Sequence, residues 1–404
     1  MSSLVSNLKS NLALAAKMAY NRHLIRAKCP RGTTLRNEGI GIVAETNYIC
    51  SLSQLARDFI DKASQTDIPF ALINSSVPFL SHTTIKDDEA AHYHKLECNR
   101  FDQRHVIHFS TIPCGKDKRY CNAITPFWEF QSGMLEHRPG LFDGADVIIA
   151  YSDFLKDYYE SLAPAGVRVI RFRYPYCAPN LTDFNRSATR KQFNVPQDAF
   201  VVFFNFDYSS CYERKNPEAV LTAFAEAFPS DSDDTMLVFK TSRAEIHPQA
   251  RAQLEATAHM LGIASRTRFV NDYLSRKDVL ALTAASDAYI SLHRGEGLGM
   301  GMLEAMSLDV PVIATAFGGN TDFVRPDTAF PIPYKLVPAH TNDPAYHAVR
   351  EWADPDISAA ASALHRLYGD HTLASSTAHA AKGFVSDHFS LENFKSDLKT
   401  FLTQ

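Results

Sequence analysis

Short apolar runs that favour β-strands alternate with helix-like segments along nearly the whole chain. The strand-like runs of the first half are 39–44, 70–73, 106–109, 147–150 and 167–172. Between them, as in 52–60 and 154–162, apolar residues recur with a helical period. This alternation predicts parallel sheets covered by helices, because parallel strands need a crossover connection.

The alternation is interrupted once and then restarts. Residues 175–196 are polar and rich in proline, as in a link between domains. The later strand-like runs are 200–205, 236–240, 267–270, 288–292 and 310–315. A chain of 404 residues fits two domains of roughly 180–200 residues better than one. We therefore predict an α/β protein with two Rossmann-like, doubly wound domains facing across a cleft.

The predicted organisation has four parts. They are a basic amphipathic extension over 1–38, a first domain over 39–185, a second domain over 186–385, and a C-terminal helix within 386–404 that packs back towards the first domain. The first 37 positions contain no acidic side chain. Their apolar residues recur at helical spacing, which leaves two hypotheses open. Residues 1–28 either lie on an anionic membrane surface or pack as a helix on their own domain.

Composition excludes several classes of protein. Hydrophobic residues make up 45% and charged residues 21%, which fits a globular enzyme rather than a disordered chain. A net charge of -4 gives no reason to expect a nucleic-acid partner. The seven cysteines form no C-x-x-C pair, as expected in a reducing compartment.

Lys17 interrupts the apolar stretch near the amino terminus, which argues against a signal peptide. No apolar run reaches the roughly 18 residues of a membrane span, so we expect a soluble, cytoplasmic protein, with contact to the inner membrane face as a further hypothesis.

A glycine-rich segment follows the predicted strand that ends near Leu292. Four glycines alternate with larger residues over 295–301, and a helix is predicted from about Met300. Glycine allows close approach of backbone to ligand, and a helix start is suited to a diphosphate. Glu296 lies in the loop and Glu304 just over one turn into the helix, so two carboxylates can flank one anion. On spacing alone, ligand binding and an ordinary turn remain open.

The residues around these glutamates resemble a known signature. The stretch 294–299, Glu304-Ala305-Met306, the run 310–315 and Gly318-Gly319-Asn320 together resemble the retaining group 1 glycosyltransferases of the GT-B fold, whose two glutamates form an E-x7-E pattern. The resemblance implies that Glu296 binds the donor hexose and Glu304 the ribose. Further donor-binding positions that it implies are Gly297, Leu298, Gly299, Met300 and Asn320.

A basic cluster opens the first helix region of the second domain. The sequence Glu213-Arg214-Lys215-Asn216-Pro217 looks like the diphosphate clamp of that family, where fixed cations stabilise the leaving phosphates. The family's usual arginine lies five residues before the lysine, where this chain has Ser210. Lys215 is therefore the predicted catalytic cation, with Arg214 and Lys240 as donor-binding candidates. The alternative for Lys215 is a solvated side chain before a helix that Asn216 caps and Pro217 begins.

The first domain supplies the acceptor-side candidates. Residues 125–129, 142–146 and 151–154 are similar to a subgroup with a W-E…D…S-x-F pattern. The similarity implies that Trp128 and Glu129 face the acceptor, although Trp128 could equally be a core residue. We expect His105 and His108 to close a strand at its cleft-facing end. We take His108 as a catalytic candidate and His105 as an acceptor-side candidate, against the alternative of buried core histidines.

The predicted reaction is transfer of a hexose-type sugar from a UDP or GDP sugar to a glycan, glycolipid or other hydroxyl acceptor in surface polysaccharide or glycoconjugate assembly. The resemblance implies retention by front-face attack, with no metal or other cofactor. Two alternatives are open: an epimerase or phosphorylase on the same fold, and a non-catalytic subunit that binds nucleotide sugar. A dinucleotide-dependent oxidoreductase is excluded because no G-x-G-x-x-G follows the first strand.

Overall fold

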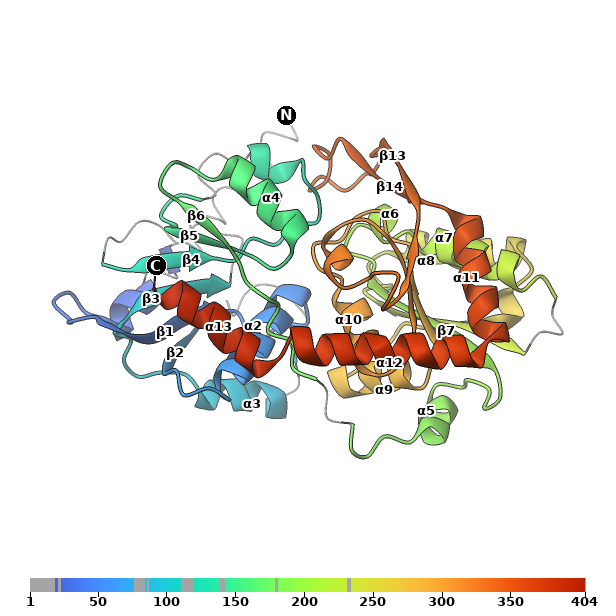
Figure 1. Ribbon diagram of the computed structural model, residues 1–404, viewed down its shortest axis with the longest axis horizontal. Coiled ribbons are helices and arrows are strands. Elements are labelled where there is room, and N and C mark those ends of the chain that lie inside the picture. The colour runs from blue at the N-terminus through green and yellow to red at the C-terminus, as the bar shows by residue number, and fades with distance from the viewer. Residues whose placement is uncertain are drawn as a thin grey trace. The chain divides into compact units, whose positions relative to one another are not determined.

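The computed structural model describes residues 19–20, 23–75, 84–85, 87–109, 119–137, 142–178, 181–230 and 234–403 (Figure 1). The chain divides into two compact units. The first consists of Met1–Trp128, Leu135–Cys177 and Phe389–Gln404. The second consists of Glu129–Met134 and Ala178–His388. Each unit is built around its own sheet.

The described part of the first unit contains one parallel sheet with the strand order β2-β1-β3-β4-β5-β6. The strands are β1 (Arg36–Ala44), β2 (Phe70–Asn74), β3 (Gln103–Phe109), β4 (Cys121–Ile124), β5 (Val147–Ala150) and β6 (Arg168–Arg171). The helical segments are α2 (Ser51–Ala63), α3 (Asp87–Lys95), the short 3-10 helix η1 (Met134–His137), α4 (Asp153–Leu162) and α13 (Leu391–Leu402).

An aromatic cluster joins the C-terminal helix to the core of the first unit. Phe394 of α13 lies 5.1 Å from Phe59 of α2 and 5.7 Å from Phe172, between ring centroids and in edge-to-face contact. Phe59 also lies 5.0 Å from Phe109 at the end of β3. Edge-to-face aromatic pairs add to the burial of apolar area. The last helix is thus part of the hydrophobic core of the first unit.

The second unit has a parallel sheet with the order β12-β11-β10-β7-β8-β9 in its described part. Its strands are β7 (Phe200–Asp207), β8 (Thr235–Ser242), β9 (Thr267–Val270), β10 (Ala288–Ser291), β11 (Val312–Thr315) and β12 (Phe330–Ile332). An antiparallel hairpin, β13 (Tyr334–Pro338) and β14 (Glu351–Pro355), follows the sheet. Counted from β7, the order is that of a Rossmann sheet, in which the first and fourth strands are neighbours.

Helices connect the strands of the second unit. They are α5 (Arg186–Gln192), α6 (Tyr212–Lys215), α7 (Pro217–Ala227), α8 (Pro248–Met260), η2 (Ala264–Arg266), α9 (Arg276–Ala284), α10 (Met300–Ser307), η3 (Gly319–Asp322), α11 (Ile357–Gly369) and α12 (His371–His388). Figure 1 shows α12 as the long red helix. The prediction of two doubly wound parallel sheets is confirmed.

Three local features differ from expectation. The short strands β4 and β12 and the hairpin β13–β14 have no predicted counterpart, and α5 lies inside the predicted link. Asn216 does precede α7, but its backbone is left-handed, with φ 53°. Its side-chain amide donates to Leu292 O at 2.9 Å instead of capping α7. Asn216 therefore ties α6 and α7 to the strand β10 region.

Among the described residues, none of the helices combines the length and apolarity needed to cross a membrane. The prediction for residues 1–28 falls largely outside the described residues, since 1–18 and 21–22 are not among them.

Candidate functional site

Two neighbouring strands bring the predicted donor-site residues together. Strand β7 pairs directly with β10 in the second unit. The chain leaves β7 towards α6, which carries Lys215, and leaves β10 into the glycine-rich loop, which carries Glu296. Strand order reverses between these two strands, and open α/β sheets bind ligands beyond the carboxyl ends of strands at that point. The fold therefore places the basic cluster opposite the glycine-rich loop.

Glu296 is the centre of a charged cluster. Lys215 Nζ donates to Glu296 Oε1 in an ion pair. Arg214 Nη1 lies 3.4 Å from the same oxygen. Burial by itself would raise the pKa of Glu296, but Lys215 and Arg214 outweigh it and lower the pKa to about 2. The carboxylate is therefore ionised at neutral pH and is held by two cations.

A turn after β11 fixes the backbone of Glu296. The amide of Gly319 donates to Glu296 O at 2.7 Å. Gly318 adopts φ 103°, and a Cβ at this position would collide with the same carbonyl oxygen. Only glycine combines this left-handed backbone with such close approach. The sequence Gly318-Gly319 thus positions Glu296 from across the loop.

The start of α10 follows Gly299, which has φ 91°. Leu298 beside it is buried. The first amides of a helix lack intrahelical acceptors and carry the positive end of the helix dipole, so they suit a phosphate. Met300 is the first residue of this helix, as predicted. The loop 297–300 therefore leads directly into a helix start of the kind that binds anions.

Glu304 lies in α10 and is paired with a cation that the sequence did not single out. Arg276 Nη1 lies 2.7 Å from Glu304 Oε1, and the Glu304 side chain is 10% exposed. Arg276 is the first residue of α9, which Ser275 caps by accepting from the amide of Asp278 at 3.1 Å. A capped helix start fixes the backbone from which Arg276 reaches Glu304.

Lys240 lies in β8, next to β7 in the sheet. Its Nζ donates to Ser242 Oγ at 2.6 Å, and burial lowers its pKa to about 8. A lysine with this pKa loses its charge in a pH range in which ordinary lysines stay fully protonated. Its protonation state will therefore respond to an anion bound nearby.

Asn320 is fully buried beside the start of α10. Its amide nitrogen donates to Thr315 O at 2.9 Å. Its Oδ1, in contrast, has no hydrogen-bond partner among the described residues, and neither has Thr315 Oγ1. A Cβ at Gly299 would stand 3.2 Å from the Cβ of Asn320, so this side chain borders the glycine-rich loop. A buried acceptor without a donor is costly, and a ligand hydroxyl is one group that can satisfy it.

His293 is a buried residue of this region that the sequence prediction missed, although it lies two residues before the first loop glycine. Its Nε2 donates to Phe317 O at 3.0 Å, so Nδ1 accepts from Ser291 Oγ at 3.0 Å. Burial lowers its pKa, which keeps the ring neutral. The neutral imidazole links the end of β10 to the loop after β11. No motif marked Arg276, which lies outside the quoted signature.

The first-domain candidates occupy separate environments. His108 Nε2 donates to Asn122 Oδ1 at 3.1 Å, and burial lowers its pKa to about 4. His105 is buried with its ring against Phe401 of α13, at 5.6 Å between centroids. Trp128 is also buried. These three side chains thus have the surroundings of core residues in the first unit, and their catalytic or acceptor roles stay predictions.

Glu129 groups with the second unit instead. Its Oε1 lies 3.4 Å from Arg214 Nη2, and its Oε2 accepts from Tyr346 Oη at 3.2 Å. The structure therefore brings Glu129, Arg214, Lys215 and Glu296 together in one cluster of alternating charges.

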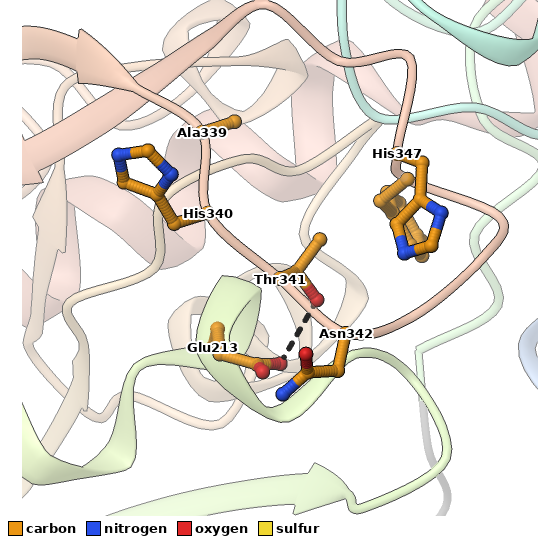
Figure 2. Close-up of a pocket in the computed structure, with 7 residues that line it drawn as sticks. Glu213, Ala339, His340, Thr341, Asn342 and His347 are labelled. Atoms are coloured by element: carbon orange, nitrogen blue, oxygen red, sulfur yellow. Dashed lines mark hydrogen bonds between the residues drawn. The ribbon is translucent and has the colours of Figure 1, made fainter.

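A polar pocket of about 390 Å³ lies beside this cluster (Figure 2). Its lining residues are Glu213, Ala339, His340, Thr341, Asn342, Tyr346 and His347. Within the part of the chain that the structure describes, no group of three or more histidine, cysteine, aspartate or glutamate side chains is arranged to hold a metal ion.

Comparison with known proteins finds similarity in sequence and in fold. Residues 185–334, which contain the whole sheet of the second unit and the loops described above, match the family model of glycosyl transferases group 1. Both units together also match solved structures of two-sheet Rossmann-like type. The second unit is therefore similar to the glycosyl transferases of group 1 over these residues.

Two curated glycosyltransferases illustrate the sequence similarity. The chain is 28% identical over 236 residues to D-inositol 3-phosphate glycosyltransferase of Streptomyces griseus, covering 55% of this chain and 48% of that protein. It is 29% identical over 171 residues to GDP-mannose-dependent monoacylated alpha-(1-6)-phosphatidylinositol monomannoside mannosyltransferase of Corynebacterium glutamicum, covering 41% of this chain and 40% of that protein. The chain thus spans less than half the length of each of these relatives.

Solved glycosyltransferase structures share the fold. The Anabaena protein HepE in complex with UDP and glucose aligns with a TM-score of 0.66 at 14% identity, over 91% of this chain and 100% of that one. Sucrose-phosphate synthase from Thermosynechococcus elongatus aligns with a TM-score of 0.63 at 14% identity, over 91% of this chain and 98% of that one. At this identity the likeness shows the fold alone, which is that of two Rossmann-like domains as in GT-B glycosyltransferases.

Proposed function

We propose that this chain transfers a hexose-type sugar, with retention of anomeric configuration, from a UDP or GDP sugar to a hydroxyl acceptor. One observation carries the proposal. Along the chain, Glu296 lies before the start of α10 and Glu304 lies after it. Glu296 is paired with Lys215 and Arg214, and Glu304 is paired with Arg276. A nucleotide sugar has a diphosphate between two polyols, and this order of groups matches it.

The roles follow from the chemistry of the leaving group. Cleavage of the glycosyl bond places negative charge on the diphosphate, which Lys215 and the first amides of α10 would stabilise. Glu296, ionised and fixed by its backbone contacts, would orient the hexose through its hydroxyls. Asn320 would satisfy its buried Oδ1 with a further donor-sugar hydroxyl. Glu304 would accept from the ribose.

Retention is proposed to proceed by front-face attack. The acceptor hydroxyl would approach on the side from which the diphosphate leaves, and a phosphate oxygen would take its proton. Positioning then accounts for most of the catalysis, because no side chain has to form a covalent bond. Since Lys215 and the helix start would supply the positive charge, the proposal includes no metal. Transfer that persists unchanged in excess chelator would support this part of it.

Two of the relatives suggest the class of acceptor. Their names contain D-inositol 3-phosphate and a monoacylated phosphatidylinositol monomannoside. We propose a glycan or lipid-linked acceptor for this chain, consistent with assembly of a surface polysaccharide or glycoconjugate. The basic residues 1–28 would then give peripheral contact with an anionic membrane. Sedimentation with anionic liposomes, before and after removal of residues 1–28, tests this point; equal binding would contradict it.

The decisive experiment is a thermal-shift screen against UDP, GDP and other nucleoside diphosphates, repeated with Glu304→Ala. We expect one nucleotide to stabilise the wild type, and we expect Glu304→Ala to weaken its binding by about tenfold to a hundredfold. Glu392→Ala, an exposed position on α13, is the matched control. If no nucleotide stabilises the wild type, or if the Glu304 variant responds equally, the assignment is wrong.

Transfer and stereochemistry are tested separately. The sugar form of the best nucleotide is supplied with candidate acceptors, and the anomeric configuration of the product is determined by NMR. Loss of donor without a glycosylated product would indicate hydrolysis, and binding without turnover would indicate a binding subunit. An inverted product would contradict front-face retention and leave the donor site intact.

A further inference from the structure

The segment Glu129–Met134 packs in the second unit, although the residues on either side of it group with the first. Two of its polar groups are bound there. Tyr346 Oη donates to Glu129 Oε2 at 3.2 Å, and the amide of Arg350 donates to Ser132 Oγ at 3.3 Å. The segment is therefore attached to the loop that joins β13 to β14.

The same segment touches the glycine-rich loop. The ring of Phe130 occupies the space that a Cβ at Gly295 would need, so the loop backbone packs directly on this ring. Phe130 also lies 5.9 Å from the ring centroid of Tyr346 in edge-to-face contact. A single short segment thus supports both the loop 339–350 and the backbone next to Glu296.

Arg214 connects these contacts to the carboxylate of Glu296. Its Nη1 donates to Gly295 O at 2.8 Å and lies 3.4 Å from Glu296 Oε1. Its Nη2 lies 3.4 Å from Glu129 Oε1, and its guanidinium carbon lies 5.7 Å from the ring centroid of Tyr346. The side chain is only 3% exposed. A guanidinium that is this deeply buried interacts with the protein groups around it. The resemblance, in contrast, implies that Arg214 binds the donor.

Helix α6 presents successive residues to different surroundings. Glu213 faces the loop 339–347, where its Oε2 accepts from Thr341 Oγ1 at 3.2 Å, as the dashed line in Figure 2 shows. Arg214 is buried, and Lys215 meets Glu296. The loop that forms the polar pocket is thus fixed to α6 at Glu213 and to Glu129 through Tyr346.

We propose that Glu129 is a positioning residue of the donor site, which acts through Arg214 and Tyr346 to hold Gly295 and Glu296 in place for the donor sugar. This role differs from the acceptor-side role that the sequence resemblance implies. It rests on the proposed function, because Glu296 is taken to bind the hexose.

The expected effect follows from the charges. Glu129 and Glu296 face the two cations Arg214 and Lys215. When Glu129 is neutralised, Arg214 loses one of its two carboxylate partners. Glu296 remains as its nearest carboxylate, so Arg214 is drawn towards Glu296. The Glu296 oxygens are then held more tightly by cations and accept a sugar hydroxyl less well. Binding of the nucleoside diphosphate alone, which does not involve Glu296, is spared.

Isothermal titration calorimetry with the nucleoside diphosphate and its sugar form tests the proposal. For Glu129→Gln we expect unchanged affinity for the nucleoside diphosphate. The gain in affinity that the sugar provides should fall by about tenfold. Tyr346→Phe, which keeps the ring but removes the hydrogen bond to Glu129, should give a smaller loss in the same direction. His347→Ala, which lines the same pocket outside the Arg214 contacts, is the control and should match the wild type.

Several outcomes would overturn the proposal. If both affinities of Glu129→Gln equal those of the wild type, Glu129 does not act on the donor site, and the acceptor-side role is preferred. If both affinities fall together, the substitution merely disrupts the site. If Glu129→Gln does not fold, Tyr346→Phe carries the same comparison. A wild-type protein that binds no nucleoside diphosphate would instead refute the proposed function itself.

Discussion

Arg276 Nη1 lies 2.7 Å from Glu304 Oε1, so the carboxylate assigned to the ribose is paired with a cation from a neighbouring helix. The Arg276 side chain is 27% exposed and that of Glu304 is 10% exposed. An arginine in this position forms a charge-assisted contact with the carboxylate and limits its rotation. The carboxylate of Glu304 is therefore held in a fixed orientation on α10.

Replacing Arg276 with glutamine is therefore expected to weaken binding of the nucleoside diphosphate by about threefold to tenfold, less than Glu304→Ala does. Titration calorimetry measures the change. Lys277→Gln, the next residue of α9, is a suitable control because its side chain is exposed and its nearest carboxylate oxygen is 3.9 Å away. Equal affinity of Arg276→Gln and wild type would mean that Arg276 does not orient Glu304.

The sheets and the central pair of the site could be predicted because their signals are local. Strand β5 coincides with the apolar run 147–150, and all of its residues are buried. Glu296 and Lys215 each follow a strand, and adjacent parallel strands bring their following loops together. Strand β4 has the same length as β5 but reads Cys-Asn-Ala-Ile, and it was missed because this is not a continuous apolar run.

The partners of the site could not be predicted because their signals are not local. Arg276 and Glu304 are distant in the sequence and meet only through the packing of α9 and α10. The contact between Glu129 and Arg214 was likewise not predicted, because the two residues are distant in the sequence and meet only in the fold. Asn216 follows the composition rule for a helix cap, yet its side chain reaches Leu292 O because its backbone is left-handed.

Lys240 is expected to take up a proton when the nucleoside diphosphate binds. Its pKa is lowered to about 8 by burial. At a pH of about 8.5 the side chain is therefore partly neutral, and a nearby diphosphate restores its charge. Calorimetry in two buffers of different ionisation enthalpy reports this uptake, which should vanish at a pH of about 6.5 and in Lys240→Arg. A binding enthalpy independent of buffer at the higher pH would show that Lys240 does not sense the donor.

The carboxylate of Glu296 should stabilise the fold except in strong acid. Its pKa is lowered to about 2, from 4.5, by Lys215 and Arg214 against the opposing effect of burial. A group with a depressed folded-state pKa contributes its stability above the unfolded value and loses it as pH falls through the folded value. The free energy of unfolding of the wild type should therefore exceed that of Glu296→Gln. This difference should shrink by about 3 kcal/mol as pH falls from about 4.5 to about 2. Unfolding followed by circular dichroism across this range measures the difference; a constant gap would contradict the ion pairing.

Gly318→Ala tests whether the turn after β11 positions Glu296. An alanine at φ 103° is strained by about 1–2 kcal/mol, and its Cβ would also collide with Glu296 O, so the loop has to move. Because the amide of Gly319 holds the same oxygen, this movement displaces Glu296 directly. We expect a loss of at least about 2 kcal/mol in unfolding free energy and a larger relative loss in sugar transfer than in nucleotide binding. Gly369→Ala, at the end of α11 with open space around its Cβ position, should cost little. If Gly318→Ala binds the nucleotide sugar as tightly as the wild type, the Gly318-Gly319 turn does not set the position of Glu296.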